Sequence, residues 1–357
     1  MIKFGVYYII VFSLFFFVCE VGITVGIRES FEERERSYLS PYACLSSETR
    51  GRQHPLASRD DMRTDFQRDR DRIIHCKSFR RLMHKTQVFL SPEHDHYRTR
   101  LTHTLEVCQV SRAIARALLL NEDLCEAVAL GHDLGHTPFG HAGERVLIKC
   151  YDPEFSHCKQ SLRVADKLEN LNLTYEVLDG ILNHSGNSNA LTLEGTIVKY
   201  ADRIAYINHD IDDAVRGGII SLEDIPTELR KTLGDTSSTR INTMVRAIVS
   251  SSAGKPEITM DPEIYEATME LRAFLFGNVY TNSEAKAEEG KAERLTEALY
   301  HHFCEHPEEM PADYVMIANA EGVERAVCDF IASMTDRYAI SVYKKIFVPE
   351  TWSKNNG

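Results

Sequence analysis

The chain has 357 residues, of which 43% are apolar and 26% are charged, and its formal net charge is −12. This composition excludes a mostly disordered chain, and the length suffices for one large helical domain or two smaller ones. A net negative charge argues against a protein that coats nucleic acid. Residues 50–100 nevertheless carry thirteen Lys and Arg against seven Asp and Glu. This local excess suits a polyanionic small molecule, a local nucleic-acid contact, or a solvated face whose charges pair with one another.

The nine cysteines are scattered and never spaced as Cys-x-x-Cys. This pattern is typical of reduced, packed thiols in a cytosolic protein, and it argues against a disulfide framework or a cysteine zinc site. The histidines are more informative, because nine of the fifteen fall between His94 and His209.

Residues 4–18 form an uncharged apolar run. The run is short for a membrane-spanning helix, and the sequence after Val18 offers no convincing signal-peptide cleavage site. An uncleaved anchor, a secretory signal and an extension outside the folded domain remain as alternatives. The folded domain is expected to be cytoplasmic, with membrane association through the apolar run left open. We predict three segments: an apolar extension at 1–27, a folded domain at 28–345 and a tail at 346–357.

Residues 28–64 are polar and are predicted to be mostly extended, with turns at the proline and glycine residues. Residues 65–88 are predicted to form one helix with a basic outer face. The next helix is predicted over 99–120, where His103 begins an apolar stripe. Arg100 lies one turn before His103 on the same face. An arginine on a buried face is expected to have an anionic partner.

Asn121 is a good N-cap for the following helix, which ends in the pair His132-Asp133. A glycine-rich loop follows, and His141 and Glu144 begin the next helix at i,i+3, so they share a face. An imidazole nitrogen beside a carboxylate oxygen suits a divalent metal. A single His-Asp pair is common by chance, however, so the site requires further ligands elsewhere in the chain.

Three more helices are predicted, at residues 161–171, 173–182 and 194–215. In the last of them, Asp202, Tyr206 and Asp210 line one side at successive turns. Isolated carboxylates among apolar residues are seldom buried without a cation. The remainder is predicted to be helical, including a solvated helix at 283–294, and no β-alternation is visible. The chain is therefore predicted to be all-α.

The metal-binding hypothesis rests on His103, His132, Asp133 and Asp202, which three predicted helices carry. Two neutral imidazoles and two carboxylates make a net-neutral site with a divalent ion, and they leave positions open for water and substrate oxygen. The ordered pattern His…His-Asp…Asp resembles that of the HD-domain metal-dependent phosphohydrolases.

Longer motifs make the resemblance more specific. The segment Gly131-His-Asp-Leu-Gly-His-Thr-Pro-Phe-Gly-His-Ala-Gly-Glu144 is similar to that of deoxyguanosinetriphosphate triphosphohydrolase-like proteins. The same holds for four further segments: Arg63–His75, Ser78–Phe89, Tyr97–Val107 and Tyr200–Asp210. The resemblance runs from about residue 28 to about residue 343. It implies an all-α HD-domain fold with additional C-terminal helices, and hydrolysis of a deoxynucleoside triphosphate to a deoxynucleoside and inorganic triphosphate.

The resemblance also implies roles for individual residues. The divalent metal, Mg²⁺, Mn²⁺, Fe²⁺ or Co²⁺, would be held by His103, His132, Asp133 and Asp202. The catalytic group would be His141 with Glu144 as its carboxylate partner, and His136 sharing the proton traffic or contacting phosphate. Substrate would be bound by Arg100 on the α-phosphate, Gln87 on the sugar 3′-hydroxyl, and by His157, Arg203, Tyr206 and Asp210.

The chain departs from the expected family segment His-Asn-Glu-Gln-Ser, in whose place it has His157-Cys-Lys-Gln-Ser161. Lys159 thus reverses a charge, and it either contacts phosphate or points to solvent. Family resemblance further implies a homo-oligomer, commonly a hexamer, and in some members a second dNTP as effector. Arg80, Arg81 and Lys85 are candidate effector residues. The alternatives are another HD phosphohydrolase, acting on nucleotides or guanosine polyphosphates, and a non-catalytic protein that binds nucleotide or nucleic acid.

Overall fold

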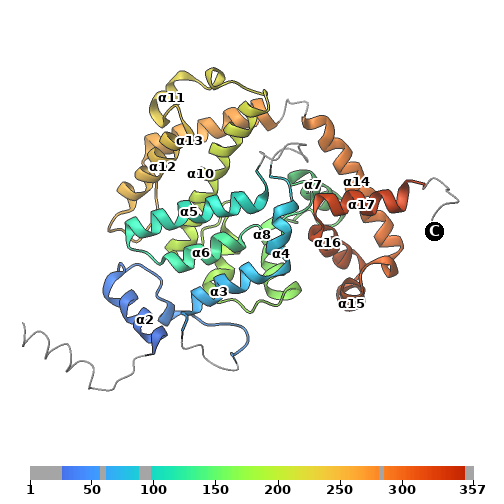
Figure 1. The fold of residues 1–357 in the computed structure, drawn as a ribbon, viewed down its shortest axis with the longest axis horizontal. Coiled ribbons are helices and arrows are strands. Elements are labelled where there is room, and N and C mark those ends of the chain that lie inside the picture. The colour runs from blue at the N-terminus through green and yellow to red at the C-terminus, as the bar shows by residue number, and fades with distance from the viewer. Residues whose placement is uncertain (1–25, 57–61, 88–97, 281–284, 350–357) are drawn as a thin grey trace, which may run out of the picture.

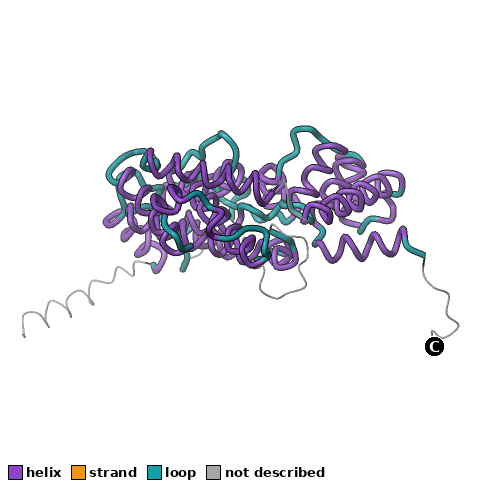
Figure 2. Tube along the Cα trace, turned by 90° about the horizontal axis from the view of Figure 1, so that it is seen from above, coloured by secondary structure: helices purple, strands orange, loops and turns teal. Residues whose placement is uncertain are grey.

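The computed structural model describes residues 26–56, 62–87, 98–280 and 285–349. Over these residues it contains helices and two isolated bridges, and no strand (Figure 2). The all-α prediction is therefore confirmed. No helix within the described ranges is both long and apolar enough to span a membrane. The alternatives for the apolar run at 4–18 lie outside the described residues.

Among the described residues before the Gly217-Gly218 turn, the α-helices are α2 Ile27–Tyr38, α3 Asp65–His75, α4 Lys77–Arg81, α5 Arg100–Leu118, α6 Glu122–Gly131, α7 His141–Cys150, α8 His157–Arg163, α9 Tyr175–Asn183 and α10 Leu193–Arg216. The described residues after that turn form α11 Thr227–Leu233, α12 Ser237–Ser252, α13 Pro262–Leu275, α14 Ala285–Glu305, α15 Ala312–Glu321, α16 Val323–Ser333 and α17 Asp336–Phe347. In Figure 1, α5 and α6 lie in the middle, α11–α13 above them and α14–α17 to one side.

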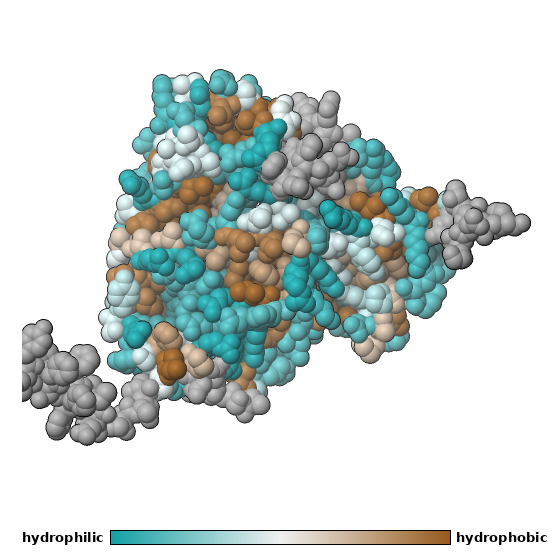
Figure 3. Space-filling model, viewed as in Figure 1, coloured by the Kyte–Doolittle hydropathy of each residue, from teal (hydrophilic) through white to brown (hydrophobic). Residues whose placement is uncertain are grey.

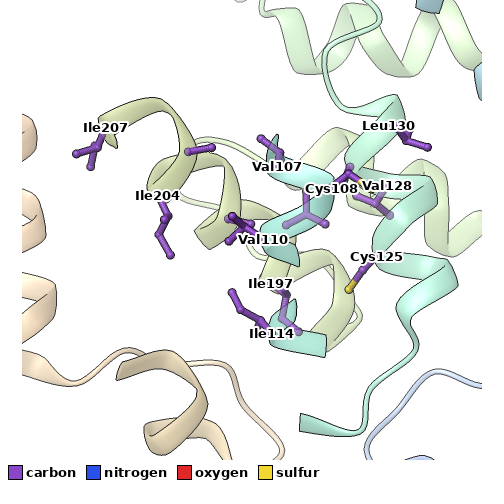
Figure 4. Packing of buried hydrophobic residues seen from close by; sticks show 14 of the residues in the cluster. Val107, Cys108, Val110, Ile114, Cys125, Val128, Leu130, Ile197, Ile204 and Ile207 are labelled. Atoms are coloured by element: carbon purple, nitrogen blue, oxygen red, sulfur yellow. The ribbon is translucent and has the colours of Figure 1, made fainter. Parts of the chain in front are cut away.

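The larger hydrophobic core forms where α5, α6 and α10 pack together (Figure 4). Each of the three helices contributes an apolar stripe at helical spacing, such as Val107, Val110 and Ile114 on α5. All three of these side chains are buried, as the sequence pattern predicts. Because α5, α6 and α10 also carry the predicted metal donors, this core fixes the positions of the site's backbone.

A second apolar cluster joins α7 to the C-terminal helices α14, α16 and α17. Phe139 and Leu147 enter it from the glycine-rich loop and α7, and Phe303 and Phe330 enter it from α14 and α16. Of the predicted solvated helix at 283–294, the described residues 285–294 belong to α14, and one face of that helix is not solvated. Ala292 is buried there, and Arg145 of α7 pairs with Glu293 at 2.7 Å. The helix that begins with His141 is thus held against α14 by apolar packing and by an ion pair.

Two predictions about the N-terminal third are wrong. Residues 28–64 contain α2, whose polar sequence lacks the apolar stripe that would reveal a helix. Ion pairs along its own surface, such as Arg28–Glu32 at 3.7 Å, support it instead. The helix predicted over 65–88 is interrupted at Cys76, where ψ is 160°. The Cys76 sulfur accepts the backbone N–H of Phe79 and so caps α4.

The basic stretch at 50–100 forms many internal pairs in its described part. Arg52 contacts the carboxylates of Asp65 and Asp69, and Arg63 pairs with Asp71 at 2.8 Å. Arg72 donates instead to the backbone carbonyls of residues 171 and 172. These contacts correspond to the alternative in which the charges pair with one another.

Glu194, in the first turn of α10, is a buried carboxyl group with a testable pH signature. Its Oε1 accepts N–H groups from Cys44 and Asn121, both at 3.0 Å, while its Oε2 has no partner. Burial raises the pKa of Glu194 to about 7. The pKa in the folded state therefore exceeds the ordinary value of 4.5. The protonated Glu194 side chain contributes its full share to the stability of the fold below pH 4.5, and this share is lost as the pH rises through 7.

Glu194→Gln is expected to raise the free energy of unfolding at pH 8 by about 1–3 kcal/mol, and to give no gain at pH 4.5. The amide keeps one accepting oxygen and removes the buried charge. Denaturant unfolding at both pH values measures the difference. Glu48→Gln, at an exposed carboxylate of the same region, is the control and should change stability by less than about 0.5 kcal/mol at either pH. An equal gain at both pH values would contradict the explanation.

Candidate active site

The loop from Gly131 to Gly140 follows α6 and is buried throughout. At its start, His132 is the C-cap of α6, and its Nδ1 lies 2.6 Å from the carbonyl of Ala129, one turn back. This bond assigns the proton to Nδ1 and leaves a lone pair on Nε2. Burial lowers the pKa of His132 to about 4, so its imidazole is neutral at pH 7. Its Nε2 is buried and has no hydrogen-bond partner.

Asp133 lies beside His132 and is paired with an arginine. Its Oδ2 accepts Nη1 of Arg100 at 2.7 Å, and both side chains are at most 4% exposed. Burial by itself would raise the pKa of Asp133, but His132 and Arg100 hold it well below its ordinary value. The anionic partner that the sequence demanded for Arg100 is therefore Asp133. The expected contact of Arg100 with an α-phosphate stays a prediction.

Two further donors complete the group. Nε2 of His103 on α5 lies 3.0 Å from Oδ1 of Asp202 on α10, and Nε2 of His132 lies 4.0 Å from the same oxygen. Burial by itself would raise the pKa of Asp202, but the hydrogen bond from His103 and the nearby His132 lower it strongly. Three elements thus bring two imidazoles and two carboxylates to one point.

This donor set fits a divalent metal. His132 offers an orphaned, buried nitrogen lone pair, and the two carboxylates are ionised at neutral pH, as metal ligands must be. The donor atoms of His103, His132 and Asp133 lie within 4.8 Å of one another. The Asp202 side chain is 19% exposed, so solvent can reach the site from the side of Asp202.

A second group of polar side chains lies against the loop. The ring of His136 stacks on that of His157 at 4.8 Å between centroids, with 20° between the planes. The donor atoms of His136, His141 and Glu144 lie within 4.8 Å of one another. Burial, reinforced by Arg100, lowers the pKa values of His136 and His141. Both imidazoles are therefore neutral at pH 7.

The carboxylate of Glu144 does not pair with His141 as the helical spacing suggested. Its Oε1 accepts the backbone N–H of His157 at 2.9 Å and lies 3.0 Å from that residue's Nδ1. His157 is the first residue of α8, which Ser156 caps by accepting the backbone N–H of Lys159. Burial by itself would raise the pKa of Glu144, but the bonds from His157 lower it to about 2. The imidazole of His141 is more exposed than that of His157.

The remaining predicted substrate residues lie on α10 and beside the loop. Asp210 is buried, accepts the hydroxyl of Tyr280, and lies 3.2 Å from Nε2 of His209. Arg203 and Tyr206 are only partly buried. Gln87 has a buried amide oxygen without a partner, and its backbone carbonyl would lie 3.5 Å from a Cβ at Gly140. The structure therefore leaves the accepting amide oxygen of Gln87 free but engages Asp210 within the protein.

The two lysines that the sequence analysis named, Lys159 and Lys85, differ in their exposure to solvent. Lys159 is 57% exposed and pairs with Glu154 at 3.3 Å, which corresponds to the solvent alternative. Lys85 is 2% exposed and its Nζ donates to the carbonyls of His136 and Ala332, so it cannot serve on an open surface. A cavity of about 620 Å³ lies beside it, and Arg81 and Lys77 contribute to its lining.

Sequence reasoning missed His184 and Cys158. His184 ends α9, is 1% exposed, and its ring lies edge-on to that of His132, 4.9 Å between centroids. Its Nδ1 contacts the carbonyl three residues back at 2.7 Å, as the Nδ1 of His132 does. A histidine directly after an apolar helix was the available signal. Nothing in the spacing showed that His184 would reach Cys158, whose sulfur is 3.7 Å away.

Gly135 is the point where the loop touches α8. A Cβ there would lie 2.1 Å from the backbone nitrogen of Ser161 and 2.2 Å from the carbonyl carbon of Gln160. Gly135→Ala is therefore expected to lower the free energy of unfolding by about 1–3 kcal/mol, because backbone must move. Denaturant unfolding measures this. Gly290→Ala in α14, with only the end of Arg294 within 4 Å of its Cβ, should instead raise stability by about 0.5–1 kcal/mol.

Comparison with known proteins agrees with this geometry. Residues 100–207 match the HD domain family, and residues 258–345 match the phosphohydrolase-associated domain family. A deoxyguanosinetriphosphate triphosphohydrolase-like protein of Caldanaerobacter subterraneus is 59% identical, over 92% of this chain and 98% of the relative. One from Clostridium perfringens is 49% identical, over 91% and 98%. A solved phosphohydrolase from Bacteroides thetaiotaomicron has 15% identity and a TM-score of 0.49, over 78% and 69% of the chains, too distant to support an argument.

Proposed function

The chain belongs to the deoxyguanosinetriphosphate triphosphohydrolase-like proteins within the HD-domain phosphohydrolases, and we propose that it hydrolyses deoxynucleoside triphosphates to deoxynucleoside and inorganic triphosphate. One observation carries the proposal: His103, His132, Asp133 and Asp202 converge from three elements beside a buried, histidine-rich loop. The family assignment supports a metal-dependent hydrolase, and the named relatives suggest the substrate.

In the proposed reaction, water attacks the α-phosphorus and the bond to the 5′ oxygen of the deoxyribose breaks. A divalent ion held by the four donors would polarise the phosphoryl oxygen. Asp133 holds Arg100 beside the donors, where its positive charge would stabilise the negative charge of the triphosphate. A neutral imidazole at His136 or His141 can take the proton of the attacking water and return it to the 5′ oxygen of the leaving deoxynucleoside.

His157 and Glu144 have a separate role in the proposal. Glu144 fixes the orientation of the His157 ring through Nδ1, so that Nε2 faces away from the carboxylate. That nitrogen is the group we assign to a phosphate oxygen. Gln87, Arg203, Tyr206 and Asp210 remain the proposed contacts to phosphate and sugar. The buried network around Asp210 makes that residue the least accessible of the four.

Product analysis tests the proposal. Each dNTP is incubated singly and in mixtures with Mn²⁺ or Mg²⁺, and products are resolved by ion-exchange chromatography. Deoxynucleoside with intact triphosphate is the expected result and would also give the base preference. Release of pyrophosphate or single phosphates would instead favour another HD phosphohydrolase. A lack of turnover under every condition, with nucleotide binding retained, would favour a non-catalytic binding protein.

The assembly and the effector are also proposed. Exposed apolar side chains, such as Leu105 and Met316, and the apolar patches in Figure 3 support a homo-oligomer, for which the family resemblance suggests a hexamer. An effector dNTP would suit the cavity that Arg81 helps to line. Lys85 would not contact the effector, because its ammonium group is buried. Activity only in dNTP mixtures would support the effector, and loss of that dependence in Arg81→Ala would locate it.

A further inference from the structure

Three side chains of metal-ligating type meet beside the candidate active site. The proposed mechanism does not use them as a group. Nε2 of His157 lies 3.5 Å from the sulfur of Cys158, and Nε2 of His184 lies 3.7 Å from the same sulfur. All three donor atoms lie within 4.8 Å of one another. Cys158 and His184 are 8% and 1% exposed, so this is an interior cluster.

The surrounding hydrogen bonds orient both imidazoles in the same way. Nδ1 of His184 lies 2.7 Å from the carbonyl of Ile181, and Nδ1 of His157 lies 3.0 Å from the carboxylate of Glu144. Each bond places the proton on Nδ1 and directs the lone pair of Nε2 toward the sulfur. Ligating histidines in metal sites have this arrangement, with a carbonyl or carboxylate behind the ring. Both Nε2 atoms therefore face the same sulfur, and one metal ion placed between them could bind all three donor atoms.

The dimensions of the cluster match a small tetrahedral ion. With zinc–sulfur and zinc–nitrogen bonds of about 2.3 and 2.0 Å, the sulfur-to-nitrogen edge of a tetrahedron is about 3.5 Å. The observed edges of 3.5 and 3.7 Å agree with that value. A thiolate selects thiophilic ions over Mg²⁺, which prefers oxygen ligands.

We propose that His157, Cys158 and His184 form a second metal site, selective for Zn²⁺ or another thiophilic divalent ion, with three protein ligands and one open position. The Cys-x-x-Cys pattern that usually reveals such sites is absent, because the third ligand comes from α9, 26 residues further along the chain. The site adjoins the first one, since the rings of His184 and His132 are in edge contact.

Occupation of this site has a consequence that rests on the proposed function. It would engage Nε2 of His157, the nitrogen assigned above to a phosphate oxygen. Zn²⁺ is therefore expected to inhibit dNTP hydrolysis. The metal site itself stands independently of that consequence, because its test below measures no turnover.

The test is a Co²⁺ titration of the full chain after metal removal with a chelator, followed by absorption spectroscopy. The wild-type protein should develop a saturable thiolate-to-cobalt charge-transfer band, to which Co²⁺ at the first site adds nothing because that site has no thiolate. Cys158→Asn should lose the band, and its affinity for Zn²⁺, measured by competition with a chromophoric chelator, should fall by at least about a hundredfold, beyond what loss of an outer hydrogen bond costs.

Two controls separate this site from the first one and from misfolding. Cys108→Ser removes another buried thiol, whose charged neighbours are Glu126, Arg112 and Arg70, and should keep the band. Asp202→Asn alters the first site and should keep it too. If Cys158→Asn loses helical circular dichroism, Cys158→Ser takes its place. Absence of the band in the wild type, or its persistence in a folded Cys158 variant, would overturn the proposal whether or not dNTPs are hydrolysed.

Discussion

Asp202→Asn is expected to lower kcat for dNTP hydrolysis by at least about a thousandfold, since loss of metal-assisted charge stabilisation costs several kcal/mol. Asp202 is the only donor of the group on α10, and its Oδ1 lies within 4.0 Å of the nitrogens of both His103 and His132. The amide keeps the shape of the side chain but removes the charge that balances a divalent ion. Steady-state turnover with saturating Mn²⁺ measures the effect.

Asp212→Asn is the matched control for this prediction. Asp212 lies on the same helix, is 32% exposed, and pairs with Arg98 at 3.7 Å, away from the four donors. Its substitution should change kcat by less than about twofold, because its ion pairs, with Arg98 and with Arg240 at 3.9 Å, involve none of the four donors. Circular dichroism should show both variants folded. Turnover within tenfold of wild type in a folded Asp202→Asn variant would remove Asp202 from the proposed metal site.

Asp329→Ala is expected to lower the free energy of unfolding by about 3–5 kcal/mol, because it leaves two guanidinium groups without their buried counter-ion. Asp329 on α16 is 0% exposed and accepts hydrogen bonds from Gln160, Arg163 and Arg325. Two of those donors lie on α8, the helix that begins with His157. The carboxylate therefore fixes the C-terminal helices to the element that supports the active-site loop, and denaturant unfolding measures its contribution.

Glu321→Ala tests whether burial is the cause. Glu321 also pairs with Arg163, at 2.8 Å, but its side chain is 39% exposed. Its loss should cost less than about 1 kcal/mol. Similar losses in the two variants would show that the number of ion pairs, rather than burial of the carboxylate, determines the effect.

Local periodicity was enough to predict the helices that carry the candidate metal donors. Asn121 caps α6 as predicted, and the predicted apolar stripe of α5 is buried. The order His103, His132-Asp133, Asp202 then predicted one site, and the structure brings the four donors together. By contrast, α2 was missed, because ion pairs along a polar surface leave no apolar pattern to read.

The sequence by itself therefore determined the all-α fold and the family, because these depend on residues three or four apart within one helix and on long family motifs. The role of the four donors as metal ligands stays a prediction. Only the tertiary structure decided which groups face one another across helices. Glu144 pairs with His157 rather than His141, Arg100 is held by Asp133, and Cys158 meets His184. These contacts depend on how α7, α8 and α9 pack against α6, and helical spacing contains no information about the packing of separate elements.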